Sequence, residues 1–221
     1  SARVRREQYV GPWLPEPVQT QAEDPIDPES ISMAFLLVLE RLSPAERAAF
    51  LLRQVFELDY GEVAAALERS EAATRQLVSR ARNRLERDRP RYTPDREAHD
   101  RLLMGFLMAA QSGDVGGMAA LLAEDVRAWS DSGGKARAAR KLVSGRDPVA
   151  RLFVGLATKN AGAGLRPELR ELNGAPGLVV WSGDQLQSAT TIETDGALIH
   201  AVHVVVNPDK LSRLASELVH A

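Results

Sequence analysis

Residues 31–88 carry apolar side chains at intervals of three and four, the spacing of helices that bury one face. The pattern predicts a first helix from Ile31. A second helix should follow Ser43, where Ser43-Pro44-Ala45-Glu46 has the residues of a capping box with proline at the first helical position. Its apolar positions Ala49, Leu52, Val55 and Phe56 extend it to about Leu58. A third helix is predicted for residues 61–67 and a fourth for residues 70–88, with Ser70 as N-cap, so this part of the chain should be all-α.

Beyond residue 95 the periodicity changes from helical to alternating. Helices are predicted for residues 99–112, 115–122 and 148–157. Strands are predicted for residues 126–130, 165–172, 178–183, 185–193 and 198–206, with turns at Asn173-Gly174 and Asp195-Gly196. This order of helices, strand, helix and successive antiparallel strands favours an α+β domain in which a curved sheet wraps on helices and encloses a pocket.

The first thirty residues contain five prolines and little periodicity, which is typical of an extended linker. Pro90 and Pro94 separate the helical block from the rest. Near the C-terminus, Asn207-Pro208 has the residues of a helix start that leads into Leu211, Leu214 and Leu218. We therefore predict a linker at 1–30, a helical domain at 31–92, an α+β domain at 95–206 and a tail helix at 207–221.

The composition narrows the function classes. The 221 residues are 44% hydrophobic and 26% charged, with a net charge of −2, which excludes a wholly basic nucleic-acid-coating protein. The absence of cysteine excludes disulfides, thiolate metal sites and cysteine nucleophiles. No apolar run approaches the roughly 20 residues of a membrane span, and no signal peptide opens the chain. We expect a cytoplasmic protein with no membrane partner, no metal and no cofactor.

Positive charge is concentrated in one stretch. Residues 71–91 hold seven arginines against three acidic residues, a net of +4. The apolar residues of the third helix are predicted to pack against those of the fourth across a three-residue turn, as in a helix-turn-helix whose second helix reads the major groove of DNA. They are Val63, Ala64 and Leu67 in the third helix and Ala73, Leu77, Val78 and Ala81 in the fourth. The alternative is a four-helix bundle with a solvated basic face, but the break, the caps and the one-sided arginines together favour DNA binding. The residues expected to face DNA are Glu71, Ala72, Arg75, Gln76, Ser79, Arg80, Arg82 and Asn83.

Three runs in this helical block resemble region 4 of extracytoplasmic-function (ECF) sigma factors: residues 42–47 (LSPAER), 56–64 (FELDYGEVA) and 70–77 (SEAATRQL). The resemblance implies that residues 31–90 recognise the −35 promoter element and dock on the flap of the RNA polymerase β subunit. By residue match, Arg75, Gln76, Ser79 and Arg80 would lie on the DNA-facing side.

Three further signatures resemble the ECF sigma factors of the J type, bacterial proteins that carry a C-terminal SnoaL-like extension. They are the linker run 9–17 (YVGPWLPEP), the run 131–135 (DSGGK), in which the family has glycine at the second position, and the run 207–211 (NPDKL). The resemblance implies a cone-shaped SnoaL-like, or NTF2-like, domain that regulates the sigma factor in cis, so that no separate anti-sigma factor is required. Such proteins begin with region 2, which does not precede Ser1, so we expect that this chain alone does not initiate transcription.

The three signatures also have plainer interpretations. Residues 131–135 could form a strand-ending turn across which Asp131 and Lys135 pair, and Asn207-Pro208 could be a helix cap. The neighbouring apolar side chains of Trp13 and Leu14 would be exposed to water in a free linker, which favours a linker that is packed on another surface. Our hypothesis is that the linker docks on the C-terminal domain near both signatures. The residues predicted for this contact are Trp13, Leu14, Pro15, Glu16, Pro17, Asp131, Gly133, Gly134, Lys135, Asn207, Pro208, Asp209, Lys210 and Leu211.

Many SnoaL-like proteins are enzymes, so an acid–base site was considered for Asp131, Asp184, His200 and His203. His200 and His203 are three residues apart, so on a regular strand their side chains should point to opposite faces and cannot form a pair. We therefore expect no catalytic residues. Three function classes stay open: a promoter-recognition subunit, which the motifs favour; a transcriptional regulator that senses a small molecule in the SnoaL-like pocket; and a SnoaL-type isomerase or cyclase fused to a helical module.

Overall fold

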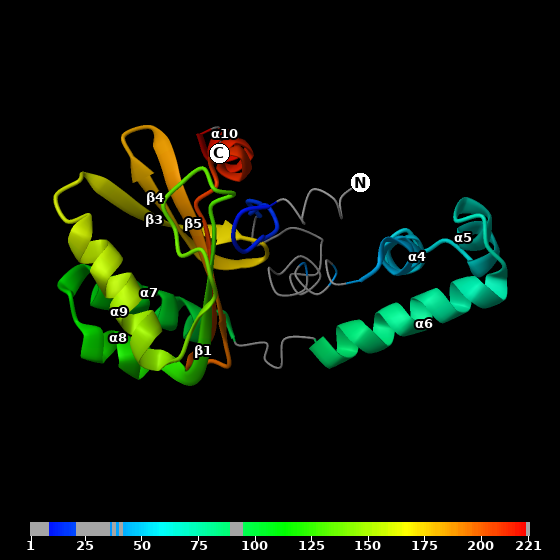
Figure 1. The fold of residues 1–221 in the computed structure, drawn as a ribbon, viewed down its shortest axis with the longest axis horizontal. Helices are drawn as coiled ribbons and strands as arrows, with labels where there is room; N and C mark the ends of the chain where they lie inside the picture. The colour runs from blue at the N-terminus through cyan, green and yellow to red at the C-terminus, as the bar shows by residue number, and fades with distance from the viewer. Residues whose placement is uncertain (1–8, 21–35, 37–38, 40–41, 89–94, 220–221) are drawn as a thin grey trace. The chain divides into compact units, whose positions relative to one another are not determined.

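The computed structural model describes residues 9–20, 36, 39, 42–88 and 95–219 of the chain. They form two compact units (Figure 1). One unit comprises residues 34–90, and the other comprises residues 91–221 together with the N-terminal residues 1–33. None of the described helices is both long enough and apolar enough to span a membrane. Most of the helix predicted from Ile31 lies outside the described residues.

From residue 42 to residue 88, the helical unit contains α4 (Pro44–Gln54), α5 (Tyr60–Ala66) and α6 (Glu71–Asp88). The predicted capping box begins α4: the Ser43 side chain accepts from the Glu46 backbone, and the Glu46 side chain accepts from the Ser43 backbone. A second capping box, which the sequence analysis missed, joins Asp59 and Glu62 at the start of α5. The Ser70 hydroxyl accepts from the backbone of Ala73, so Ser70 caps α6 as expected.

The prediction that the second helix continues to Leu58 is wrong. The helix α4 ends at Gln54, and the side chains of Val55 and Phe56 are 60% and 67% exposed instead of buried. The backbone N–H groups of Val55 and Phe56 both donate to the Leu51 carbonyl, and Glu57 takes a positive φ of 55°. This local turn ends the helix although the apolar spacing continues.

Two small clusters hold the helices together. Ala49 of α4, Val63 of α5, and Leu77 and Val78 of α6 form the cluster of the helix-turn-helix. Ala81, which is predicted to pack against the third helix, lies instead with Leu85 against Leu39 and Leu42. The helix α6 therefore buries one stripe along its length and leaves the opposite face in solvent.

The described residues of the second unit form one sheet and four helices. Its helices are α7 (Arg96–Ser112), α8 (Val115–Leu121), α9 (Arg146–Lys159) and α10 (Pro208–Val219). Its strands are β1 (Leu122–Asp131), β2 (Val143–Ser144), β3 (Leu165–Leu172), β4 (Ala175–Ser182), β5 (Gln185–Thr194) and β6 (Ile199–Val205). The strand order is β2-β1-β6-β5-β4-β3, with β3 to β6 antiparallel as predicted and β1 parallel to β6.

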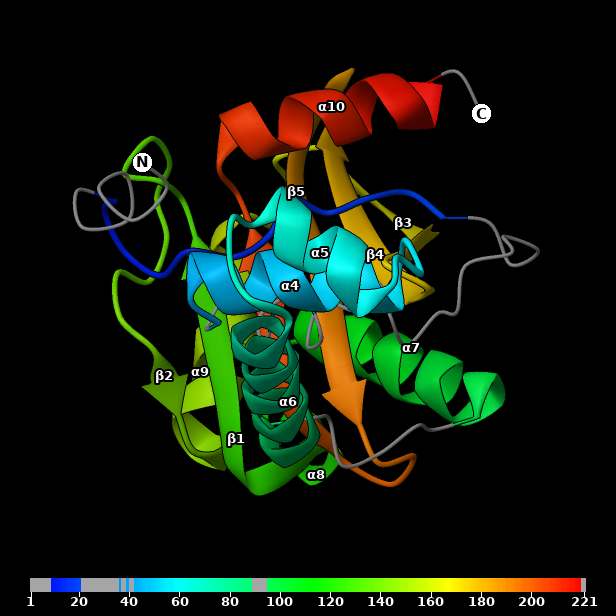
Figure 2. The ribbon, with the colours of Figure 1, turned by 90° about the vertical axis from the view of Figure 1, so that its right-hand side faces the viewer.

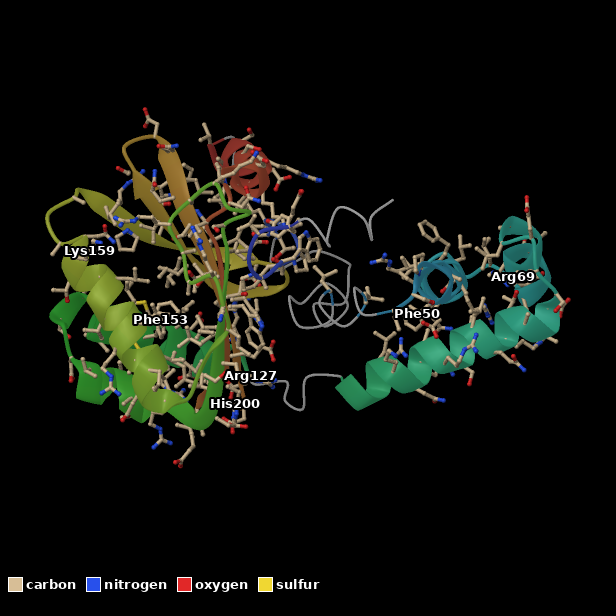
Figure 3. All side chains as sticks on the ribbon, viewed as in Figure 1. Phe50, Arg69, Arg127, Phe153, Lys159 and His200 are labelled. Atoms are coloured by element: carbon tan, nitrogen blue, oxygen red, sulfur yellow. The ribbon has the colours of Figure 1, made fainter. Side chains whose placement is uncertain are left out.

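The sheet has different coverings on its two faces. Helices α7, α8 and α9 lie against one face of the sheet (Figure 1). There Phe106 of α7 meets Phe153 of α9, which Figure 3 labels, edge to face with ring centroids 4.9 Å apart. The C-terminal helix α10 and the segment 9–20 lie on the other side (Figures 1 and 2). This is the α+β arrangement expected for a SnoaL-like domain, and the face without α7 to α9 carries the candidate site.

Candidate functional site

The segment 9–20 is packed on the second unit rather than extended in solvent. The side chain of Leu14 is fully buried, at 0% exposure, and Pro15 and Pro17 are buried beside it. At its end, the backbone of Thr20 donates to the Glu171 carbonyl and the Asn173 backbone donates to the Val18 carbonyl at 2.9 Å. The segment therefore adds a short stretch of backbone pairing to the last residues of β3 (Figure 2).

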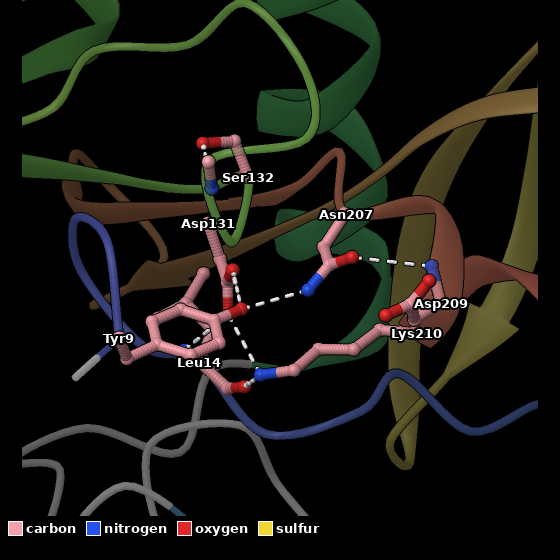
Figure 4. A network of polar contacts seen from close by, with 8 residues as sticks. Tyr9, Leu14, Asp131, Ser132, Asn207, Asp209 and Lys210 are labelled. Carbon is pink, nitrogen blue, oxygen red and sulfur yellow. Dashed lines mark hydrogen bonds and ion pairs between the residues drawn. The ribbon is translucent and has the colours of Figure 1, made fainter. Parts of the chain in front are cut away.

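Asp131, at the end of β1, is the centre of the contacts with this segment (Figure 4). Its side chain is fully buried. One carboxylate oxygen accepts from the Tyr9 hydroxyl, and the other accepts from the Leu14 backbone N–H at 2.7 Å and from the Lys210 ammonium at 2.8 Å. Three donors, two from the segment and one from α10, thus satisfy this buried carboxylate.

The Lys210 ammonium lies on the other side of the same contact. It donates to the Leu14 carbonyl as well as to Asp131, and it lies 4.1 Å from the centre of the Trp13 ring and 5.1 Å from that of Tyr9. Two aromatic rings and one carboxylate thus replace water around a buried cation. The first turn of α10 places this side chain, because Asn207 caps the helix by accepting from the Asp209 backbone at 3.1 Å.

Tyr9 connects the segment to both signatures of the second unit. Its hydroxyl donates to Asp131 and accepts from the Asn207 side-chain amide at 2.8 Å. Burial, and next the hydrogen bond to the Asp131 carboxylate, raise the pKa of the Tyr9 hydroxyl. The hydroxyl therefore keeps its proton for this bond at neutral pH. Tyr9 belongs to the linker signature, but its role in the contact was not predicted.

The glycines at 133 and 134 allow the close approach of the linker. Both have positive φ, 56° and 77°. A Cβ at Gly133 would lie 2.5 Å from the Asn207 side-chain nitrogen and 3.0 Å from the Tyr9 hydroxyl, and one at Gly134 would lie 3.1 Å from Val10. Both the backbone conformation and the space require glycine here.

The interpretation in which Asp131 and Lys135 pair across the turn is wrong. Asp131 pairs with Lys210, and Lys135 pairs with Asp209 on the surface. The turn directs the two side chains to different neighbours. Asp131 is the last residue of β1 and its side chain is buried against the linker, whereas the Lys135 side chain is largely in solvent. Of the other residues predicted for the contact, Leu211 is buried, whereas Glu16 and Pro208 are exposed.

The eight residues predicted to face DNA all lie on the exposed side of α6. Leu77, Val78 and Ala81 are buried on its opposite side. Three arginines of α6 contact other side chains of the protein. Arg75 lies 3.2 Å from Glu71 and 4.2 Å from the centre of the Tyr60 ring, while Arg80 and Arg84 approach the Glu46 carboxylate at 3.6 Å and 3.4 Å. Glu46 and Tyr60 were not among the predicted site residues.

The side chains considered for catalysis are not brought together as an acid–base site. His203 is 1% exposed and stacks on Trp129 with ring centroids 5.0 Å apart, whereas His200 contacts Asp195 at 3.0 Å near the β5–β6 turn. Burial, and next the positive charge of Arg127, lower the pKa of His203 to about 3, so the ring is neutral at neutral pH. Among the described residues, no cluster of three or more His, Asp or Glu could hold a metal ion.

The helix-turn-helix with its exposed arginines and the linker-bound α+β domain define a class of protein: a DNA-reading transcription factor with a fused SnoaL-like domain. The sequence model described as "Sigma-70, region 4" matches residues 32–85. The ECF RNA polymerase sigma factor SigJ of Mycobacterium tuberculosis is 38% identical over 96% of this chain and 73% of its own length. The crystal structure of SigJ matches 93% of this chain and 76% of that chain at 36% identity, with a TM-score of 0.69.

A probable ECF sigma factor of the same organism, SigI, is 26% identical over 99% of this chain and 74% of its own length. The chain belongs to the ECF RNA polymerase sigma factors, and its similarity to SigJ over both units supports the J type. It is a promoter-recognising transcription-initiation factor rather than an enzyme, and its partners are core RNA polymerase and promoter DNA. The ligand-sensing and isomerase alternatives are therefore not favoured.

Proposed function

We propose that α6 reads the −35 element of the promoter through Arg75, Gln76, Ser79 and Arg80. The observation that carries this proposal is that all four side chains are exposed on one face, while the opposite face of α6 is buried against α4 and α5. Arginine and glutamine can each make paired hydrogen bonds to a base edge in the major groove. Arg82 and Asn83 are also exposed, farther along the same side, and we assign them to phosphate contacts.

The test is a comparison of Arg80→Ala with Arg82→Ala on a library of randomised duplexes. Arg80→Ala should weaken binding to the preferred sequence by about 1–3 kcal/mol and relax the preference at one base position. Arg82→Ala should weaken binding to all sequences alike and reduce the salt slope by about one unit. Free binding should be weak because this face carries only a few positive charges, so the assay is run with and without core polymerase. A uniform loss for Arg80→Ala would make it a phosphate contact.

We infer that the turn between α4 and α5 is part of the surface that docks on the β flap of the polymerase. Val55 and Phe56 are the supporting observation, since they expose neighbouring apolar side chains within the helical unit. Phe56→Ser should weaken binding of the chain to core polymerase, while Phe56→Leu, which keeps an apolar side chain, should retain most of it. Equal binding of both variants and the wild type would place the flap contact elsewhere.

We further propose that the C-terminal domain regulates promoter recognition in cis by holding the linker. In sigma factors of this type the linker precedes region 4, so a docked linker restricts the poses that region 4 can take on the polymerase. The support is the buried contact of Tyr9, Leu14, Asp131 and Lys210. A regulator within the chain makes a separate anti-sigma factor unnecessary.

If the linker regulates DNA binding, Trp13→Ala should both loosen the linker from the C-terminal domain and change DNA binding. Trp13 contributes ring area and a cation–π contact to Lys210. Protease cleavage within residues 9–20 should become faster, and the affinity of the core-bound chain for its preferred duplex should change. The proposal fails if both quantities stay at their wild-type values.

A further inference from the structure

The predicted base-reading arginines of α6 are each held by a side chain from a preceding helix. Glu46, at the third position of α4, is the first of these side chains. Its carboxylate is 10% exposed, accepts from the Ser43 backbone at 2.9 Å, and lies 3.6 Å from Arg80 Nε and 3.4 Å from Arg84 Nη1. Because α4 and α6 are packed together, the position of this carboxylate is fixed by the fold.

Glu46 is charged at neutral pH. Hydrogen bonds from the Ser43 backbone and side chain, and then the positive charges of Arg84 and Arg80, lower the pKa of its carboxyl group. A negative charge on the DNA-facing side of a DNA-binding unit opposes the attraction to phosphates. The capping hydrogen bond alone does not require that charge, because glutamine can also make it at this position of a capping box. The charge is favoured at the N-terminus of α4, and it also lies beside two arginines of α6.

Tyr60, the first residue of α5, is the second holding side chain. The guanidinium of Arg75 lies 4.2 Å from the centre of its ring, and that of Arg53 from α4 lies 5.1 Å away. Glu71 contacts the same Arg75 guanidinium at 3.2 Å, one turn earlier on α6. Arg75 is thus bounded by an aromatic ring and a carboxylate, which restricts its rotamers although the side chain is exposed.

Such restriction matters for reading a base. An arginine side chain that is free in solution loses conformational entropy at several rotatable bonds when it makes a bidentate contact, and that loss opposes binding. A guanidinium that is already oriented in the free protein avoids part of this loss, but only for the base edge that it faces. Phosphate contacts gain little from orientation because they are long-range and non-directional by comparison.

We propose that Glu46 and Tyr60 are positioning residues for promoter recognition: without touching DNA, they orient Arg80 and Arg75 for base contacts. Glu46 lowers the affinity for DNA in general and raises the preference for the correct sequence. The proposal rests on the proposed reading of the −35 element by α6, and it adds that the specificity of this reading is set from α4 and α5.

The test is Glu46→Gln, which keeps the volume and the capping hydrogen bonds and removes the charge. The ratio of affinities for the preferred duplex and a scrambled duplex should fall by about threefold to tenfold, since a well-placed arginine discriminates between bases by about fivefold or more. The affinity for the scrambled duplex should stay equal or rise. A purely structural role for Glu46 would instead lower both affinities together with the melting temperature.

Tyr60 is tested by a matched pair. Tyr60→Phe keeps the ring and should retain the wild-type sequence preference, whereas Tyr60→Leu should relax the preference at the base that Arg75 contacts and leave the Arg80 position unchanged. NMR relaxation of the Arg80 and Arg75 Nε–H groups without DNA gives an independent readout. Each should become more mobile in its own variant, Arg80 in Glu46→Gln and Arg75 in Tyr60→Leu.

The outcomes of these tests distinguish the positioning proposal from the proposal on which it rests, that α6 reads the −35 element. If the wild-type chain shows no sequence preference, or Arg80→Ala leaves it intact, the reading of the −35 element by α6 is wrong. If Arg80→Ala relaxes the preference but Glu46→Gln and Tyr60→Leu leave both the preference and the arginine mobility unchanged, only the positioning proposal is overturned. If Glu46→Gln lowers the stability of region 4, the positioning proposal is tested by the mobility of Arg75 in the two Tyr60 variants: equal mobility in both overturns it.

Discussion

Two regions of this sigma factor use the same chemistry, carboxylates paired with long cations, in opposite surroundings. At the linker contact Asp131 is fully buried and Lys210 nearly so. On the exposed side of α6 the arginine side chains are largely in solvent: Arg80 is 62% exposed and lies 3.6 Å from the Glu46 carboxylate. A buried pair is costly to break because the partner that remains cannot return to water, whereas an exposed pair adds little stability. The first arrangement suits holding a segment in place, and the second leaves cations available to an incoming ligand.

The largest predicted effect comes from breaking the buried pair. Asp131→Asn leaves the Lys210 ammonium buried without its carboxylate, and we expect a loss of about 3–5 kcal/mol in the free energy of unfolding. Chemical denaturation measures this loss, and amide exchange of residues 9–20 shows whether the linker is released.

The matched control for that variant is Asp209→Asn. Asp209 also pairs with a lysine, Lys135, but both side chains are more than half exposed. The expected loss is below about 1 kcal/mol, with no change in linker exchange. Equal effects of the two substitutions would contradict the contrast between buried and exposed pairs.

A somewhat smaller effect is expected for the apolar part of the linker contact. Leu14→Ala removes a fully buried side chain, which should cost about 2–5 kcal/mol. Val10→Ala, in the same segment, removes a side chain that is about half exposed and should stay within about 0.5 kcal/mol of wild type. Denaturation midpoints of the two variants provide the measurement, and a Leu14→Ala chain as stable as Val10→Ala would show that the segment is not docked in solution.

The smallest predicted effect depends on pH. The folded-state pKa of His203 is about 3 against an ordinary 6.5, so between these values the unfolded chain binds more protons and stability falls as the pH falls. The expected loss from pH 6.5 to 5.5 is about 1 kcal/mol, with no contribution from His203 well above pH 6.5. His99, whose pKa burial also lowers, contributes with the same sign.

His203→Phe keeps a ring against Trp129 and removes the titration. Unfolding free energies at pH 5.5 and 7.5 should therefore differ less in this variant than in the wild type. If Glu193, which lies 3.4 Å from His203, stabilised the protonated ring instead, the wild type would not lose stability in this range.

Local sequence signals predicted most of the fold. Capping residues such as Ser43 and Ser70, and the turn at Asn173-Gly174, set element ends correctly because their physical effect acts over a few residues. The two-residue strand β2 was missed because it has no periodicity of its own. The helix α4 was predicted too long because the turn at Glu57 has no glycine to mark it.

The contact residues were harder to predict. The motifs drew attention to Asp131 and Lys210, but their pairing joins segments about 80 residues apart, and no local pattern shows which lysine meets Asp131. The contacts of Tyr9 with Asp131, of Glu46 with Arg80 and of Tyr60 with Arg75 were not predicted for the same reason, since each joins residues from different helices or strands. Such partners follow from packing rather than from spacing.

The central claim, that linker docking controls promoter recognition, is tested most directly by measuring the affinity of the core-bound chain for its preferred −35 duplex. Wild type is compared with Asp131→Asn and Asp209→Asn, with amide exchange of residues 9–20 followed in the same samples. The account predicts that Asp131→Asn releases the linker and raises the affinity by about tenfold, equivalent to about 1.4 kcal/mol, while Asp209→Asn behaves as wild type. A released linker with unchanged DNA affinity would contradict it.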